Sequence, residues 1–215
     1  MDLQIALLLG QDGIVNGAIY GLLAVALVLV FSVTRENFIP QGEFVSFGAL
    51  TLAMMQTGAV PSTLWLLLVL AVIVLVLDIW RSRSGGEISW TASLFWTVVM
   101  PCVAVLLAVV VRPSSLMLQA VTALAIITPM GPLMYRLVYR PLANATVLML
   151  LIVSVAMHGV LVGLGLLFFG AEGSRTPAFS EVQFQLGDIT VSGQSLFVLG
   201  VTITLVVLLF VFFER

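Results

Sequence analysis

The sequence predicts an all-α fold: a polytopic membrane helix bundle of about seven transmembrane segments, forming one domain over residues 1–215. The first observation is composition, since 61% of the residues are hydrophobic and 8% are charged, whereas soluble domains carry roughly 25% charged residues. The second is a mean hydropathy of +1.24. The third is that charges, prolines and glycines divide the chain into long apolar segments, and about 20 apolar residues suffice to cross a lipid bilayer as a helix.

The expected spans cover, in chain order, residues 14–33, 39–57, 62–77, 90–111, 115–135, 145–169 and 195–213. The start of the chain lacks the positively charged region of a signal peptide, so we expect the first apolar run to remain in the mature protein. A polar loop over residues 170–194 separates the last two spans and is the longest stretch that is able to be ordered in water.

The first expected span carries Gly13, Gly17 and Gly21 at intervals of four residues. This interval places the three glycines on one helix face, where a second helix can approach closely. Asn16 and Tyr20 lie beside that face. A role in helix packing and a contact with a transported solute both remain open for them.

The second expected span begins with Pro40-Gln41-Gly42-Glu43. We interpret Glu43 as the only acidic residue inside an apolar run, because a long uncharged segment follows it. A carboxylate in the membrane is costly unless it faces protein, a polar partner or water, which makes Glu43 a candidate functional residue. The alternative is a plain helix start, in which Pro40 takes the first helical position and the next residues favour the positive end of the helix dipole.

The middle of the chain is divided by charges and prolines. The third expected span closes at the charged group Asp78, Arg81 and Arg83, which leads into a polar turn. Pro101 is expected to kink the fourth span, and Thr128–Pro132 to break the second half of the fifth.

The segment Tyr135–Leu142 is interpreted as a basic and aromatic collar at the membrane surface. The sixth span follows and contains Ser154 and His158, which share a helix face because they are four residues apart.

The arginines predict the orientation of the chain. With seven spans, the positive-inside rule places the N-terminus outside, the C-terminus in the cytoplasm and the 170–194 loop outside. This assignment requires the short second span to cross the membrane. The six arginines that fall on the cytoplasmic side are Arg35, Arg81, Arg83, Arg136, Arg140 and Arg215.

Several kinds of chemistry are excluded by residue type. The chain has no Lys, which excludes a phosphate-binding loop of the ATPase type. One His and one Cys cannot form an ordinary metal site, so neither metal nor cofactor is expected. Ser154 and His158 lack a third residue that would orient a catalytic base, so we expect no catalytic residues and no enzyme. The arginines form no cluster that would bind nucleic acid. A proton relay has little support, because Glu43 and His158 are far apart in sequence.

The stretch Phe38–Ala49 resembles a signature of the branched-chain amino-acid (Liv-type) ABC transporter permeases. In that family the first spanning helix leads to an Asn-x-(Ala/Pro)-(His/Gln)-Gly-Glu motif, which a Gly-Ala/Ser helix follows. The matching residues here are Pro40-Gln41-Gly42-Glu43-Phe44 and Gly48-Ala49. Further segments match the family in the same order: Gly17 with Tyr20-Gly21-Leu22, Tyr139-Arg140-Pro141-Leu142, Phe169-Gly170 and Ile189–Leu196.

The chain departs from the family pattern at three points. Phe38 stands where the family has its motif Asn, and Asn37 lies one position early. Residues 62–111 form an insertion relative to the family. The sequence ends at Arg215, where the family continues into the cytoplasmic loop that docks on the ATPase, so the resemblance implies an N-terminal portion of a permease, from truncation or a split gene.

The resemblance implies a pore-forming subunit of an ABC importer in a bacterial inner membrane. Its partners would be a second permease subunit, two ABC ATPase subunits and a periplasmic substrate-binding protein. The solute would be a branched-chain amino acid or a related amide or urea. The residues that the resemblance and the patterns nominate for translocation, gating or helix packing are Gln41, Gly42, Glu43, Asn16, Tyr20, Gly17, Gly21 and His158. The alternative is a secondary transporter, or another polytopic membrane protein that has no ATPase partner.

Overall fold

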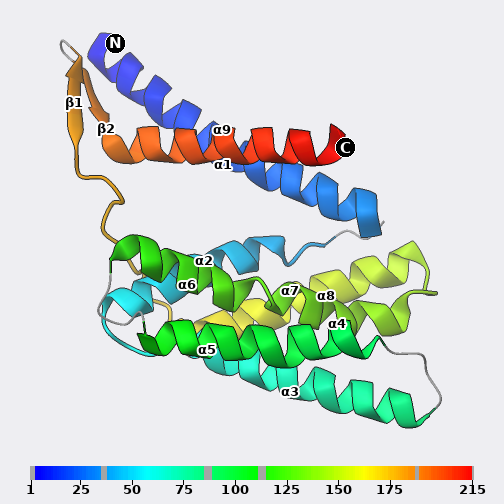
Figure 1. Ribbon diagram of the computed structural model, residues 1–215. Coiled ribbons are helices and arrows are strands. Elements are labelled where there is room, and N and C mark those ends of the chain that lie inside the picture. The colour runs from blue at the N-terminus through cyan, green and yellow to red at the C-terminus, as the bar shows by residue number, and fades with distance from the viewer. Residues whose placement is uncertain (1–2, 35–37, 85–88, 111–114, 187–188, 215) are drawn as a thin grey trace. The chain divides into compact units, whose positions relative to one another are not determined.

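The computed structural model describes residues 3–34, 38–84, 89–110, 115–186 and 189–214, and it shows an all-α polytopic membrane helix bundle (Figure 1). Within these ranges, six helical segments are long and apolar enough to span a membrane, and a seventh helix is shorter. The predicted fold class is therefore confirmed. Residues named above that lie outside the described residues are Arg35, Asn37 and Arg215.

The described chain falls into two compact units, one formed by residues 1–35 and 177–215 and the other by residues 36–176. The elements of the first unit are α1 (Leu3–Thr34), β1 (Gln183–Leu186), β2 (Ile189–Ser192) and α9 (Gly193–Glu214). Those of the second unit are α2 (Gln41–Gln56), α3 (Ser62–Arg83), α4 (Trp90–Leu94), the π-helical segment η1 (Phe95–Val99), α5 (Met100–Val110), α6 (Leu116–Ile127), α7 (Met130–Met134), the π-helical segment η2 (Tyr135–Tyr139), the 3₁₀ turn η3 (Arg140–Leu142) and α8 (Val147–Phe169).

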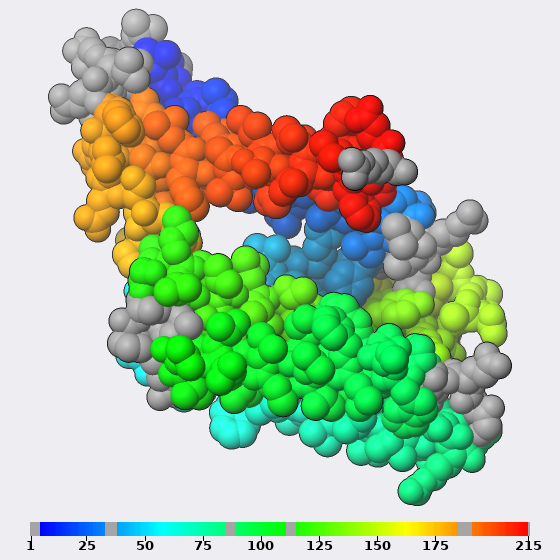
Figure 2. Space-filling view, viewed as in Figure 1, coloured from blue at the N-terminus to red at the C-terminus, as the bar shows by residue number. Residues whose placement is uncertain are grey.

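The core of the second unit is built on one face of α3. Leu67, Ala71 and Val74 are buried at helical intervals and pack with residues of α5, α6 and α7, among them Ile126 and Leu133. The space-filling view shows side chains of α3 and α5 lying against each other along the face turned to the viewer (Figure 2). The opposite faces of these helices carry exposed apolar side chains, as expected for helices that contact lipid.

Helix α2 is too short to span the hydrocarbon core by itself. It has 16 residues, which correspond to about 24 Å at 1.5 Å per residue, against a hydrocarbon thickness of about 30 Å. Pro40 lies at its N-cap and the helix begins at Gln41, so the proline is one position earlier than predicted. The predicted orientation of the termini depended on a full crossing here, and it stays a prediction.

Two helices extend beyond the predicted spans. Helix α1 begins at Leu3 instead of residue 14, and α3 continues past Leu77 to Arg83. Both extensions include an acidic residue, Asp12 in α1 and Asp78 in α3. Because helix propagation tolerates single charged residues, a charge does not by itself end a helix.

Both π-helical segments end two residues before a proline. The Met100 N–H bonds to the Phe95 carbonyl just before Pro101, and the Arg140 N–H bonds to the Tyr135 carbonyl just before Pro141. Proline cannot donate to the carbonyl four residues earlier and clashes with it, so a wider turn relieves the conflict. The predicted distortion near Pro101 takes this form. The predicted break in the fifth span is confirmed, because α6 ends at Ile127 and α7 begins at Met130.

In the first unit, α1 packs against α9, and the two helices cross in Figure 1. No residue in the apolar window of either helix is buried. The expected polar loop contains an antiparallel hairpin that the sequence analysis did not predict, in which β1 pairs with β2. The Gly193 N–H donates to the Val182 carbonyl at 2.6 Å and joins the hairpin to the start of α9.

Candidate functional site

The candidate site lies where the start of α2 meets the middle of α8. The buried Ser154 hydroxyl accepts a hydrogen bond from the Ile39 backbone N–H at 2.9 Å. It also lies 3.1 Å from the Tyr139 hydroxyl, which donates to it from η2. The Phe38 ring packs between the rings of Phe44 and Tyr139, with centroid distances of 5.6 and 5.8 Å. Ser154 therefore hydrogen-bonds to both Ile39 and Tyr139, which are about a hundred positions apart in the chain.

Helix α2 starts near the middle of α8 and runs alongside it. Ser154 and His158 are the eighth and twelfth of the 23 residues of α8, and they face Ile39 and Glu43 respectively. Further along, the Phe47 ring would lie 3.1 Å from a Cβ placed on Gly165. If α8 crosses the membrane, the N-terminus of α2 lies at about half its depth, where backbone N–H groups need protein partners. The Ser154 hydroxyl supplies one of these partners.

Glu43 and His158 meet across the α2–α8 contact. Glu43 Oε1 lies 2.7 Å from His158 Nδ1, and the exposed fractions of the two side chains are 14% and 45%. The second oxygen, Oε2, is buried and accepts no hydrogen bond from the described residues. The two residues were considered far apart in the sequence analysis, and the fold brings them into contact because α2 packs against α8.

Ser154 and His158 share a face of α8, as their spacing predicts. Each nevertheless has a different neighbour, since Ser154 contacts Ile39 and Tyr139 while His158 contacts Glu43.

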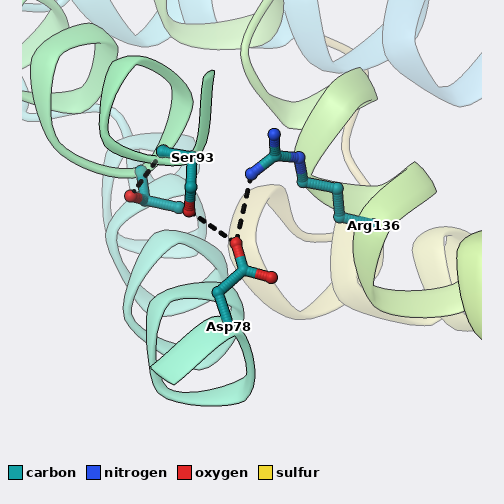
Figure 3. Close-up of polar contacts among 4 residues, drawn as sticks. Asp78, Ser93 and Arg136 are labelled. Atoms are coloured by element: carbon teal, nitrogen blue, oxygen red, sulfur yellow. Dashed lines mark hydrogen bonds and ion pairs between the residues drawn. The ribbon is translucent and has the colours of Figure 1, made fainter. Parts of the chain in front are cut away.

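The second polar group is centred on Asp78, which is 1% exposed (Figure 3). Its Oδ2 atom accepts a hydrogen bond from the Ser93 hydroxyl at 2.5 Å and lies 3.1 Å from Arg136 Nη1. The Ser93 carbonyl in turn accepts from the Thr97 hydroxyl at 2.8 Å. The Oδ1 atom of Asp78 has no hydrogen-bond partner among the described residues. The network joins α3, α4 and the two π-helical segments.

Asp78 corrects the interpretation that Glu43 is the only acidic residue inside an apolar run. The carboxylate follows Leu67, Ala71 and Val74 at intervals of four, three and four residues, so it continues the buried face of α3. This spacing was visible in the sequence, but the charged residues after Asp78 suggested a helix end. The other acidic residue inside an apolar helix, Asp12 of α1, is exposed.

The position of Tyr135–Leu142 at the membrane surface stays a prediction, but two of its side chains face the interior of the bundle. Tyr139 is buried and Arg136 is 13% exposed, and both side chains point to partners within the bundle. The physical reason is that each polar group finds a buried partner, Ser154 for the tyrosine and Asp78 for the arginine. Arg140, by contrast, is exposed.

Two further polar contacts in the core were missed by the sequence analysis. The hydroxyls of Thr51 and Thr63 lie 2.7 Å apart, and both side chains are fully buried. Gln56 of α2 donates a hydrogen bond to the buried Gln119 of α6. Neutral polar residues gave no signal in the sequence, because only the packing of α2, α3 and α6 shows that they face each other.

Of the remaining predicted site residues, four belong to the first unit and two to the start of α2. Asn16, Tyr20, Gly17 and Gly21 belong to α1 in the first unit, and Asn16 and Tyr20 are exposed. A Cβ atom placed on Gly17 or Gly21 would meet nothing within 4 Å, so the glycine face has room for another helix. Gly42 is equally open, whereas Gln41 is partly buried in the first turn of α2.

The arrangement places ionisable side chains in contact within a membrane bundle. It contains two carboxylates, one imidazole and one guanidinium in two separate pairs, Glu43–His158 and Asp78–Arg136. No group of three or more metal-ligating side chains occurs among the described residues.

No protein-family model, curated protein or solved structure matches this chain.

Proposed function

We propose that the chain is the membrane-spanning permease subunit of an ABC importer for branched-chain amino acids or related small solutes such as amides or urea. The observation that carries the proposal is that two segments resembling the permease family contact the same residue. Ile39, beside the Pro40–Glu43 motif, and Tyr139, the first residue of the Tyr-Arg-Pro-Leu turn, both bond to Ser154. Short sequence matches that occur by chance have no reason to lie together in the fold.

The position of α2 supports a transport role. A short helix that begins beside the middle of a candidate span resembles the half-length segments of discontinuous helices, which form solute and ion sites in transporters. In this proposal, the second permease, two ABC ATPases and a periplasmic binding protein complete the importer in a bacterial inner membrane. The chain itself supplies the wall of the solute path and carries out no covalent chemistry.

A tagged form of the chain, expressed in its native membrane and solubilised in mild detergent, tests the proposal. We expect an ABC ATPase and a second permease to co-purify with it, both identified by mass spectrometry. A tagged polytopic membrane protein of unrelated sequence serves as the control. Recovery of the chain without any ATPase, in detergents that preserve other ABC complexes, would contradict the proposal.

A secondary transporter is the second candidate, and one observation favours it. Such proteins use interrupted helices from more than one part of the fold. The sequence indicates one interruption, at Thr128–Pro132, and the start of α2 beside Ser154 supplies another. Purified chain in liposomes would then accumulate solute in response to an ion gradient without ATP, whereas the ABC permease alone would not.

A further inference from the structure

We propose that the junction of α1, β2 and α9 binds a phosphatidylethanolamine molecule, with an acyl chain in an apolar groove and the headgroup ammonium at Gln11. The inference goes beyond the transport role, because this ligand is a membrane lipid and not a transported solute. It starts from a groove of about 350 Å³ whose lining residues all belong to the first unit. Among them are Leu7, Gly10, Gln11 and Ile14 of α1, Val191 of β2 and Leu199 of α9.

The walls of the groove suit an acyl chain. Of the described residues that line it, only Gln11 has a polar side chain. The exposed fractions of Leu7 and Ile14 are 41% and 64%, and a Cβ atom placed on Gly10 would meet nothing within 4 Å. Contiguous apolar surface that is left uncovered marks a binding site for protein or membrane lipid. Because α1 and α9 are both long and apolar enough to span a membrane, the molecule at hand to fill the groove is a lipid.

The groove lies at the level where a lipid headgroup meets its chains. Helix α9 begins at Gly193, directly after the hairpin, and its 22 residues correspond to about 33 Å, against about 30 Å of hydrocarbon. If α9 crosses the membrane, its first turn therefore lies at the membrane surface. Ser195 belongs to that turn, and its Oγ atom accepts a hydrogen bond from Gln11 Nε2 at 3.3 Å. Both helices begin beside the hairpin, so Ile14 and Leu199 lie deeper than Gln11 and Ser195 (Figure 1).

Gln11 supplies an acceptor for the headgroup. Its Oε1 atom is buried and accepts no hydrogen bond from the described residues. An acceptor that is withdrawn from water without a partner is unfavourable, so a donor that reaches it is favoured. The Gln11 side chain lines the groove and is only partly buried as a whole, which lets a group in the groove approach the carboxamide. A primary ammonium such as that of ethanolamine has three N–H donors, whereas the trimethylammonium of choline has none.

The charges of the first unit favour a cationic donor over an anionic headgroup. The described charged residues near the hairpin are Asp12 and Glu181, both of them acidic and exposed. The described residues of this unit include no basic side chain. Anionic lipids are usually recognised by clustered Lys and Arg side chains. The groove therefore has no counterpart for a net negative headgroup, and the ammonium of ethanolamine is the group that its surroundings attract.

A bound lipid would stabilise the first unit. No residue in the apolar window of α1 or α9 is buried, so the two helices hold each other through few apolar contacts. An acyl chain at the junction adds contacts to both helices and to Val191 of the hairpin. A ligand that binds the folded state and not the unfolded state raises stability by mass action.

The test compares lipids that have identical acyl chains. We would purify the full chain in mild detergent, add phosphatidylethanolamine or phosphatidylcholine, and measure the bound fraction by native mass spectrometry. The two lipids have the same net charge and differ in their N–H donors. We expect the wild-type chain to bind phosphatidylethanolamine about tenfold more tightly, the effect of one charge-assisted hydrogen bond. Phosphatidylglycerol should bind no more tightly than phosphatidylcholine. Equal affinities for the ethanolamine and choline lipids, or a preference for the glycerol lipid, overturn the proposal without any substitution.

One pair of variants assigns the headgroup contact. Gln11→Met keeps the length of the side chain and removes the carboxamide oxygen, so the two affinities should become equal while that for phosphatidylcholine is unchanged. Gln183→Met makes the same change at an exposed position of β1 and should retain the preference. A preference that survives in Gln11→Met would overturn the role of Gln11.

A second pair of variants assigns the acyl chain. Gly10→Leu places a side chain in the groove without meeting other atoms, and it should weaken binding of both lipids. Gly173→Leu, in the polar loop, should weaken neither. Unchanged binding by Gly10→Leu would show that the lipid lies elsewhere. The measurements involve no ATPase, so a failed co-purification and a failed lipid site remain distinguishable.

Discussion

Arg136 Nη1 lies 3.1 Å from Asp78 Oδ2, and this ion pair joins the π-helical turn η2 to the buried face of α3. Both side chains are largely withdrawn from solvent, and Ser93 donates to the same oxygen of the carboxylate. An ion pair inside a bundle fixes the register of the helices that carry it more than it adds net stability, because both charges lose their hydration. We therefore expect the Asp78–Arg136 pair to set how α3 and η2 face each other.

Replacement of one partner of this pair should be strongly destabilising. We expect Asp78→Asn to lower the stability of the purified protein by about 3–5 kcal/mol, because Arg136 is left as an unpaired buried charge. The double variant Asp78→Asn/Arg136→Gln should recover part of this loss. Thermal unfolding in detergent measures both, with Arg83→Gln at the exposed end of α3 as the control. A loss no larger than that of the control would argue against a buried pair.

The hydroxyl of Ser154 is predicted to hold α2 at the middle of α8. Ser154→Ala leaves the Ile39 N–H without this acceptor and removes the partner of the Tyr139 hydroxyl, which should cost about 1–3 kcal/mol. Tyr139→Phe removes only the contact between the Tyr139 and Ser154 hydroxyls and should cost less. Hydrogen exchange at the start of α2 should accelerate in Ser154→Ala. The exposed Ser46→Ala is the matched control, and equal exchange in both variants would refute the role of Ser154.

Pro141 is predicted to maintain the π-helical turn that presents Arg136. A π turn holds more residues than an α turn, so its conversion to a regular helix rotates Arg136 about the helix axis and away from Asp78. Pro141→Ala should therefore destabilise the protein by about 1–2 kcal/mol, although it removes a helix-breaking residue.

The effect of Pro141→Ala should be less than additive with that of Asp78→Asn in a double-mutant cycle, with a coupling energy of about 0.5 kcal/mol or more. Pro177→Ala, at an exposed loop position, provides the control. A stabilising effect of Pro141→Ala would show that the π turn is not needed for the ion pair.

Gly17→Leu should separate assembly from folding. A side chain at Gly17 meets nothing within 4 Å in this chain, so the variant should unfold at the same temperature as the wild type. If the glycine face receives a helix of a partner subunit, the added side chain blocks its approach, and we expect loss of co-purifying permease and of solute uptake. Val28→Leu, at another exposed position of α1, should retain both. Wild-type uptake by Gly17→Leu would rule out this use of the glycine face.

Some boundaries of the expected spans agree with the helices of the structure and others do not, and the difference depends on the residues at each boundary. The expected spans that begin at Ser62 and Trp90 have the same starts as α3 and α4, because Pro61 and a polar turn precede them. The end of α3 was placed too early, since Asp78 was taken as a boundary although it continues an apolar face. The hairpin of the polar loop gave no apolar pattern strong enough to predict strands.

The sequence analysis predicted individual residues of the candidate site but not the contacts between them. Glu43 and His158 were each singled out, because a charged or titratable residue in an apolar segment is conspicuous in any sequence. Their contact was not predicted, since nothing in the sequence indicates which positions of α2 and α8 face each other. Ser93, Thr51 and Gln119 were missed altogether, because neutral polar residues occur in membrane helices without a detectable spacing rule.

By itself, the sequence determined that this protein is a bundle of apolar helices in a membrane. The reason is that hydropathy and segment length are sums over neighbouring residues, and they need no knowledge of the fold. Only the tertiary structure decided that Asp78 is buried against Arg136, that α2 starts beside Ser154, and that Glu43 meets His158. Those outcomes depend on which helix faces come together, and pairing between distant segments is fixed by packing of the whole unit rather than by any local pattern.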